Sequence, residues 1–484
     1  MILLIARFLQ ILLSVASIKL SSHVLAPEQM GRFALANSIV AFFAFMFLNP
    51  VGMFMNRRMH SWWREGQWLG YQLWFYLYVL AVALLAVLTL FLGPSFYGGL
   101  QMTFGWMVLL ICGSIVVTTS NQVLVSSLNL LGFAMPFAVL TVLTPMVGLA
   151  LSWLLCDALG LRAEYWLSGL LLGQGIVSIA AIVLFRVRLA ARLGPRPTVR
   201  APTNDMLRRL FVYAWPISIA VVLGWSQNQG YRLVMEHFIG LKELGIFVAA
   251  YGIALGIMSA VESLLASLLQ PRFYLRLNSH SESSAEAWND YAAIALPILV
   301  LTAGTLAAAS SEAVHIFLAP AYWGTATFVC WASAIELTRT AANTYSLCMH
   351  AAMNTRRLIG PSLIGAVLLV GFLTPAARFL GLEGVGPAMT LAGILYLASW
   401  HSAAHRLSGI SFPLRRVLIA LAGGLAAFGA TSVIHMMRLP FTSAITTTIS
   451  VAPVVTIYMF IAAALIRPAI SERQRVAPLQ RSST

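Results

Sequence analysis

Long apolar segments separated by short polar connections make up most of this 484-residue chain. Many segments reach about 18 or more residues, the length that a helix needs to cross the hydrocarbon core of a bilayer. The pattern therefore predicts an all-α polytopic membrane protein with about 14 spans. The predicted spans lie near residues 3–23, 33–55, 69–92, 102–127, 137–155, 166–186, 211–236, 246–270, 291–310, 325–349, 359–377, 386–404, 417–437 and 443–466.

One design occurs twice in the chain: a polar turn, then about two dozen mostly apolar residues, then an arginine. The two copies are Leu25–Arg58 and Ile239–Arg272, and their starts are 214 residues apart. The matching residues are Gly31 and Gly245 in the turns, and Arg58 and Arg272, which each follow their glycine by 27 residues. This repeat predicts two related halves, with one six-helix bundle in each.

The halves meet at a basic, proline-containing stretch that reads as an exposed linker. The expected domains are an N-terminal six-helix bundle at 1–190, a cytoplasmic linker at 191–210, a C-terminal six-helix bundle at 211–406, an extra transmembrane helix pair at 407–466, and a basic cytoplasmic tail at 467–484. Of the 30 lysines and arginines, 21 lie in connections after even-numbered spans and five after odd-numbered ones. The positive-inside rule therefore places both termini in the cytoplasm.

Composition excludes several classes of protein. Charged residues make up 9% of the chain, against about 25% in a soluble domain, and hydrophobic residues make up 60%. The net charge of +15 follows from basic cytoplasmic loops and scarce acids, so no nucleic-acid partner is expected. Lys19 and Lys242 are the two lysines, and neither has P-loop context. The four cysteines form no CxxC, so they indicate neither a disulfide framework nor a zinc site. We also expect no cofactor, no catalytic residues and no enzymatic activity.

Polar residues inside the predicted spans recur at helical spacing. In lipid such residues face the protein interior or water, so each stripe marks one face of a helix. Two readings remain open: a wet cavity between the bundles, or helix–helix hydrogen bonding with no cavity. The stripes comprise Arg7, Gln10, Ser14, Ser17 and Ser21 in span 1; Trp225, Gln229, Arg232 and Glu236 in span 7, with Asn228 beside them; and Ser333, Glu336, Thr340 and Asn343 in span 10, with Arg339 beside them.

Ionisable residues in these spans have both structural and functional readings. Arg7 lies near a membrane surface, where it either snorkels or lines the cavity. Glu336 and Arg339 are three residues apart, so they form either a structural ion pair or a binding or coupling pair. Glu262 has no partner nearby in the sequence, and it is either a protonated core acid or a coupling carboxylate.

The cavity hypothesis assigns roles to these side chains. The substrate-binding candidates are Arg7, Gln10, Ser14, Arg58, Asn228, Gln229, Arg232, Arg272 and Arg339, and the ion-coupling candidates are Glu236, Glu262 and Glu336. Ordinary anchoring at the membrane surface is the other reading for Arg58 and Arg272.

The segments LAPEQMGRFALANSI and WPISIAVVLGWSQNQGYRLVMEHFIGLKELGIFVAAYGIALGI resemble Wzx-like polysaccharide biosynthesis/export flippases of the multidrug/oligosaccharidyl-lipid/polysaccharide superfamily. The resemblance covers about residues 1–406. It implies two pseudo-symmetric six-helix lobes in a V, as in MATE transporters, with cavity arginines that attract pyrophosphate. Many members have twelve spans, so the last two predicted spans depart from the pattern.

The resemblance implies a flippase that moves a polyprenyl-pyrophosphate-linked oligosaccharide repeat unit across the inner membrane for exopolysaccharide, capsule or O-antigen synthesis. Its expected partners are that lipid-linked substrate, membrane lipids, a polysaccharide polymerase and chain-length machinery. The alternatives are a MATE-type cation/drug antiporter, a membrane polymerase or ligase, and other transporters, including a flippase for a peptidoglycan precursor.

Overall fold

The computed structural model describes residues 2–92, 98–184, 203–278, 284–351, 355–436 and 451–465. These residues form helices and helical turns, with no strand among them. Twelve of the helices are long and apolar enough to cross a membrane. The predicted tenth span is also a helix, Ala326–Ala351, although Glu336 and Arg339 make it less apolar. The predicted fourteenth span begins outside the described residues and continues as the shorter apolar helix Val451–Leu465. Together these helices confirm the predicted fold class, an all-α polytopic membrane protein.

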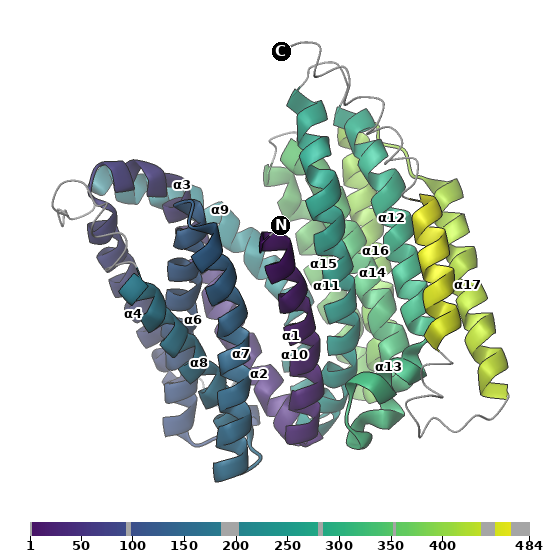
Figure 1. Cartoon of the computed structure of the whole chain (residues 1–484), viewed down its shortest axis with the longest axis horizontal. Helices are drawn as coiled ribbons and strands as arrows, with labels where there is room; N and C mark the ends of the chain where they lie inside the picture. Colours follow the sequence, from purple (N-terminus) through teal and green to yellow (C-terminus); the bar gives the residue numbers. More distant parts are fainter. Residues whose placement is uncertain are drawn as a thin grey trace. The chain divides into compact units, whose positions relative to one another are not determined.

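The helices group into two compact units, Met1–Val248 and Ala249–Thr484 (Figure 1). The first unit contains α1 (Ile2–Val24), α2 (Pro27–Phe43), α3 (Asn49–Arg64), α4 (Trp68–Leu92), α6 (Phe104–Leu130), α7 (Ala134–Leu159), α8 (Ala163–Leu184), α9 (Asn204–Asn228), α10 (Tyr231–Phe238) and the start of α11 (Leu241–Asn278). The second contains the rest of α11, α12 (Ser284–Ala308), α13 (Ser310–Phe317), α14 (Ala326–Ala351), α15 (Ile359–Leu380), α16 (Leu382–Ser408), α17 (Leu414–Met436) and Val451–Leu465.

The boundary between the units falls inside α11, later than the linker expected at 191–210. Residues 185–202 lie outside the described part of the chain, and α9 begins directly after them at Asn204. α9 and α10 pack against α3 and α2, so they belong to the first unit. The division into 1–190 and 211–406 describes the repeat in the sequence, and it stays a prediction.

The two repeated turn glycines lie at a reciprocal contact within the first unit. A Cβ atom built on Gly31 would lie 2.0 Å from the carbonyl oxygen of Leu241, the first residue of α11. A Cβ built on Gly245 would lie 1.7 Å from the carbonyl oxygen of Pro27, the first residue of α2. In each case the partner is four residues before the other glycine. The first turns of α2 and α11 therefore approach so closely that neither position has room for a side chain.

Two predicted spans are interrupted. Between α2 and α3 the chain forms a π-helical turn, Ala44–Leu48, directly before Asn49-Pro50. A proline inside a helix lacks the N–H that would continue the hydrogen-bond ladder, and the Tyr78 hydroxyl donates to the carbonyl of Phe47, at 3.0 Å. Predicted span 7 ends as α9 and restarts as α10 after a break at Gln229–Gly230. Broken helices of this kind occur where a membrane protein binds a ligand.

In the second unit, the core surrounds Trp288 of α12. This side chain is fully buried; its Nε1 donates to the carbonyl of Thr344 on α14 at 3.0 Å, and its ring lies 5.0 Å from that of Tyr345. The C-terminal pair packs on the same helix, since Gly304 of α12 meets Gly424 of α17 and the side chains of Thr302 and Tyr458 are hydrogen-bonded. α12 thus joins the C-terminal pair to the core of its unit.

Candidate functional site

A buried arginine of the first unit is held by neutral oxygen atoms. Arg232 in α10 is 9% exposed. Its Nη1 donates to the carbonyl of Ala34 at 3.1 Å and to Oγ of Ser38 at 3.2 Å, both on α2, and its Nε donates to the hydroxyl of Tyr231 at 3.2 Å. No carboxylate within the described residues forms an ion pair with it. The positive charge of this guanidinium is therefore not neutralised by any described ion pair.

Ser38 connects α2 to both sides of the break between α9 and α10. It is fully buried, its Oγ donates to Oε1 of Gln229 at 3.3 Å, and its carbonyl accepts from Nε1 of Trp225 at 3.0 Å. The predicted stripe of span 7 thus converges on a residue that the sequence did not single out. A serine inside a predicted span was the available signal, but serine is common in membrane helices. We refer to Ala34, Ser38, Trp225, Gln229 and Arg232 as the Ser38 cluster.

A second polar cluster joins α11 and α14 in the second unit. Glu336 is fully buried. Its Oε2 accepts from Nε of Arg339 at 2.9 Å, and its Oε1 accepts from the Tyr251 hydroxyl on α11. The predicted pairing of Glu336 with Arg339 is therefore present, and a tyrosine hydroxyl completes it. Burial of a carboxylate is costly unless it is paired in this way.

Arg339 also reaches across to Glu262, which had no partner near it in the sequence. Nη2 of Arg339 lies 3.4 Å from Oε2 of Glu262 and 3.3 Å from Oγ of Ser259. The other carboxylate oxygen of Glu262 accepts from Nδ2 of Asn343 at 2.8 Å. We refer to Tyr251, Ser259, Glu262, Glu336, Arg339 and Asn343 as the Glu336 cluster.

The Glu336 cluster has one arginine between two carboxylates. With all three groups ionised its net charge is −1, because a single guanidinium is shared by Glu262 and Glu336. The cluster extends from the fully buried Glu336 to the exposed Asn343, so one end is accessible. The carboxylate in excess can attract a small cation.

The polar residues predicted in span 1 do not enter either cluster. Arg7 and Ser14 are exposed on α1, and Nη1 of Arg7 donates to Oε1 of Gln10 at 3.2 Å. Ser21, further along the stripe, is buried and donates to the carbonyl of Ile18 at 3.0 Å. The binding roles assigned to Arg7, Gln10 and Ser14 stay predictions.

Two further candidates lie beside the Ser38 cluster. Asn228 is exposed at the end of α9, and its Nδ2 donates to the carbonyl of Gly224 at 2.9 Å. Glu236 packs over Gly99, where an added Cβ would lie 1.7 Å from its carboxylate. Glu236 thus contacts a glycine of the first unit and is not an ion-pair partner of Arg232.

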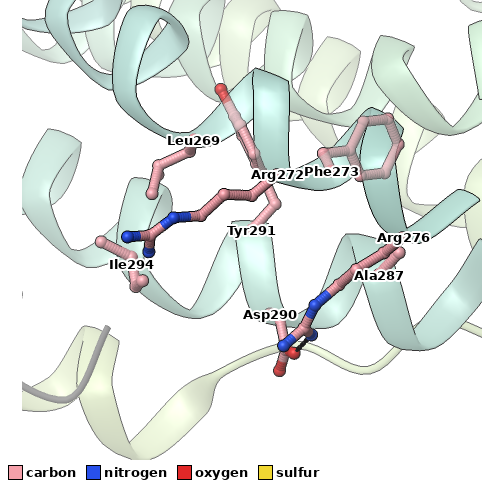
Figure 2. Close-up of a pocket in the computed structure, with 8 residues that line it drawn as sticks. All are labelled: Leu269, Arg272, Phe273, Arg276, Ala287, Asp290, Tyr291 and Ile294. Atoms are coloured by element: carbon pink, nitrogen blue, oxygen red, sulfur yellow. Dashed lines mark hydrogen bonds and ion pairs between the residues drawn. The ribbon is translucent and has the colours of Figure 1, made fainter. Parts of the chain in front are cut away.

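The two repeat-ending arginines have different surroundings. The Arg58 guanidinium lies over the Phe54 ring, 5.1 Å from its centroid. Arg272 lines a small pocket of about 60 Å³ between α11 and α12. Figure 2 shows Arg272 directed toward Ile294, and Arg276 directed toward Asp290, with which it is ion-paired. Their roles in binding a headgroup stay predictions.

Solved structures with a similar fold are transporters and flippases. Lipid II flippase MurJ, in an inward closed conformation, matches 97% of this chain and 99% of its own, with a TM-score of 0.70 and 15% identity. An inward-facing multidrug resistance MATE family transporter of the MOP superfamily matches 83% of this chain and 95% of its own, with a TM-score of 0.61 and 15% identity. A MATE in the straight conformation matches 83% and 94%, with a TM-score of 0.50 and 14% identity.

No protein-family model matches the sequence, and no curated protein matches it. These comparisons do not show the Wzx-like family itself. At these identities the likeness concerns the fold alone, and the chain has the fold seen in a lipid II flippase and in MATE transporters.

Proposed function

We propose that this protein is a flippase that moves a polyprenyl-pyrophosphate-linked saccharide between the leaflets of the bacterial inner membrane. The observation that carries the proposal is the extent of the likeness to lipid II flippase MurJ. That match leaves about 3% of the 484 residues uncovered, or roughly 15, so it includes most of the C-terminal pair. The MATE match leaves about 17%, or roughly 82 residues, close to the length of 407–484. The MurJ match therefore covers more of this chain than the MATE match does, and this greater coverage favours the lipid flippase.

The Ser38 cluster supplies chemistry suited to a phosphate group. A pyrophosphate cannot cross hydrocarbon unaided, because removing its charges from water is prohibitively costly. A guanidinium held by neutral oxygens keeps its charge available, and its planar fork matches phosphate oxygens. Arg232 is the residue that would attract the pyrophosphate in this proposal, with Gln229 and Asn228 beside it.

The Glu336 cluster supplies the coupling in this proposal. Its net charge of −1 with all groups ionised disfavours an approaching pyrophosphate, so Arg339 is better suited to holding the two carboxylates than to binding substrate. Uptake of a proton or a monovalent cation would bring the cluster to neutrality. Glu262, at the accessible end, is the proposed exchanging group, and Glu336 is its buried partner.

A reconstituted assay tests the two roles separately. Purified protein in liposomes receives a fluorescent polyprenyl-pyrophosphate disaccharide, and a membrane-impermeant quencher reports transfer between leaflets. Arg232→Gln should slow transfer about tenfold or more, since a hydrogen bond to a charged group contributes about 1.5–3 kcal/mol. Arg209→Gln is the control, because Arg209 is an exposed arginine on α9 paired with Asp205. If both variants transfer the lipid at the same rate, Arg232 is not part of the substrate-binding site.

The coupling role predicts a different result. Glu262→Gln should retain transfer without an ion gradient and lose its acceleration by an imposed proton or sodium gradient. If the variant still responds to both gradients as the wild type does, the Glu336 cluster is not the coupling site.

The finer proposal concerns the pathway. An oligosaccharide repeat unit for exopolysaccharide, capsule or O-antigen would place a polymerase and chain-length machinery among the partners. A panel of labelled lipid-linked saccharides in the same assay separates that cargo from a peptidoglycan precursor. Reporter fusions at both ends test the cytoplasmic location of the termini.

A MATE-type cation/drug antiporter is the second candidate, favoured by the acidic balance of the Glu336 cluster and by the MATE match. Expression in a drug-sensitive strain separates the two. A rise in resistance to cationic drugs without lipid transfer would support the antiporter.

A further inference from the structure

A pocket of about 330 Å³ lies at one end of the first unit, outside both clusters. Ligand pockets in proteins usually have volumes of about 300–1,000 Å³. It is formed where α2, α6 and α8 begin and where the connection before α6 passes them. Its lining residues are Gln29, Arg32, Gln101, Thr103, Trp106, Arg162, Glu164 and Tyr165.

Two lining residues have buried polar atoms that lack a partner. Glu164 is 7% exposed, and its Oε2 has no hydrogen-bond partner within the described residues. Nε of Arg32 is also buried and has none in the same part of the chain. Buried polar atoms of native proteins are nearly always hydrogen-bonded. Two residues that line this pocket therefore each have a buried polar atom without a described partner, one an acceptor and one a donor, and a hydroxyl group can satisfy either.

The rest of the Arg32 guanidinium is fixed in place. Its Nη2 donates to Oε1 of Glu28 at 2.6 Å and to Oε1 of Gln101 at 2.8 Å. Gln101 has a φ of +48°, the one positive value at a non-glycine residue within the described chain. That conformation favours glycine and costs energy at any other residue. The hydrogen bond from Arg32 to the side-chain amide of Gln101 offsets part of this conformational cost.

Aromatic rings form another part of the pocket. The rings of Trp106 and Tyr165 meet edge to face, with centroids 5.8 Å apart. Such rings offer an apolar surface with a polar tip. Gln29 is already engaged, since its Oε1 accepts from the backbone N–H of Ala163 at 3.0 Å. The pocket therefore combines aromatic surface, amides, a carboxylate and a guanidinium.

The charge balance argues against a phosphate as the occupant. Glu28 and Glu164 balance the charges of Arg32 and Arg162, so these four groups have no net positive charge, and the unpaired carboxylate oxygen of Glu164 repels an anion. Arg32 and Arg162 also belong to the five basic residues on the side of the membrane that the charge bias predicts to be periplasmic. Two of those five line this one pocket.

We propose that this pocket binds a pyranose ring of a saccharide on the predicted periplasmic side. Glu164 accepts hydrogen bonds from sugar hydroxyls, Nε of Arg32 donates to a hydroxyl oxygen, and Trp106 and Tyr165 cover the apolar face of the ring. The identity of this saccharide as the headgroup of the transported lipid rests on the proposed function. The binding itself does not.

Saturation-transfer NMR on the full chain in lipid nanodiscs tests the site. The probes are three soluble disaccharides, built from neutral hexose, N-acetylhexosamine and hexuronic acid. At least one should bind saturably, and Trp106→Ala and Glu164→Gln should each weaken it about tenfold, the effect of losing a hydrogen bond to a charged group or an equivalent contact. Glu164→Gln keeps the shape of the side chain, so it serves if Trp106→Ala does not fold. Trp153→Ala, at an exposed tryptophan of α7 outside the pocket, should bind within about twofold of the wild type.

Saturable binding by none of the three disaccharides, or equal binding by wild type, Trp106→Ala and Glu164→Gln, would overturn the proposal. The liposome assay separates this failure from failure of the flippase. If the protein transfers the lipid-linked disaccharide but binds no soluble saccharide, the flippase proposal is supported and the saccharide site is rejected. If both pocket variants weaken saccharide binding but the protein transfers no lipid, the saccharide site is supported and the flippase proposal is rejected.

Discussion

The two polar clusters each place an arginine among helices of one unit, but they differ in what surrounds it. Arg232 is held by neutral acceptors, while Arg339 is shared by two carboxylates. The first cluster therefore has a positive charge without a described counter-ion, and the second has a carboxylate in excess. Sequence reasoning grouped both arginines as substrate ligands. Their surroundings support two different proposed roles, anion attraction for Arg232 and ion coupling for the Glu336 cluster.

We expect the largest change in the free energy of unfolding when the arginine of each cluster is replaced in turn. Arg339→Met leaves Glu336 buried and unpaired, so we expect a loss of about 3–5 kcal/mol in the free energy of unfolding. Arg232→Met leaves only neutral groups behind and should cost about 1–3 kcal/mol. Thermal unfolding in detergent measures both. The double variant Arg339→Met/Glu336→Gln should regain part of the loss, and equal losses for the two single variants would erase the distinction between the clusters.

A smaller effect is expected where α2, which carries Ser38, meets α11. Gly31→Ala places a Cβ against the carbonyl of Leu241, and overpacking of this kind typically costs about 1–3 kcal/mol. The control is Gly371→Ala on α15, where a Cβ meets nothing within 4 Å. Gly371→Ala should be neutral or stabilising by up to about 1 kcal/mol. The same thermal measurement checks both, and a Gly31→Ala protein as stable as Gly371→Ala would contradict the close contact.

Ser38→Ala tests how the first cluster holds its arginine. The change removes the hydroxyl that accepts from Arg232 and donates to Gln229, while the carbonyl of Ala34 remains. We expect a loss of about 1 kcal/mol in stability, the usual contribution of one hydrogen bond. Lipid transfer should slow with it, because the guanidinium loses part of its orientation. Ser432→Ala, at a half-buried serine of α17 that donates to a backbone carbonyl of its own helix, is the control and should change neither quantity.

The smallest stability effect is expected in the saccharide pocket. Gln101→Gly relieves the positive φ and removes the amide contact with Arg32, two effects of about 1 kcal/mol with opposite sign. Unfolding should therefore change by less than about 1 kcal/mol, while disaccharide binding weakens. A large loss of stability with unchanged binding would assign Gln101 a purely structural role.

Sequence periodicity predicted the helices and much of the first cluster. The spacing of Trp225, Gln229 and Arg232 placed them on one face, and all three contact Ser38. The break at Gly230 was not predicted, because the polar residues on both sides of it have the spacing of one continuous helix. An added Cβ there would lie 2.5 Å from the carbonyl oxygen of Ser226.

Side-chain contacts between helices that are far apart in the chain could not be predicted from the sequence. Glu262 lies 77 residues from Arg339 and 81 from Asn343, so no local spacing reveals the contacts. The saccharide pocket was missed for another reason. Glu164 lies just before the predicted span 166–186 and was not a candidate, whereas the structure buries it in the first turn of α8. The arginines on the sparsely basic side, Arg32 and Arg162, were the signal that could have indicated it.

The reciprocal packing of Gly31 on Leu241 and of Gly245 on Pro27 makes the two helix starts depend on each other. Each helix presents a glycine to the backbone carbonyl of the other, so the two close contacts form as a pair. A side chain added at either glycine would push the two helices apart and would weaken both contacts together.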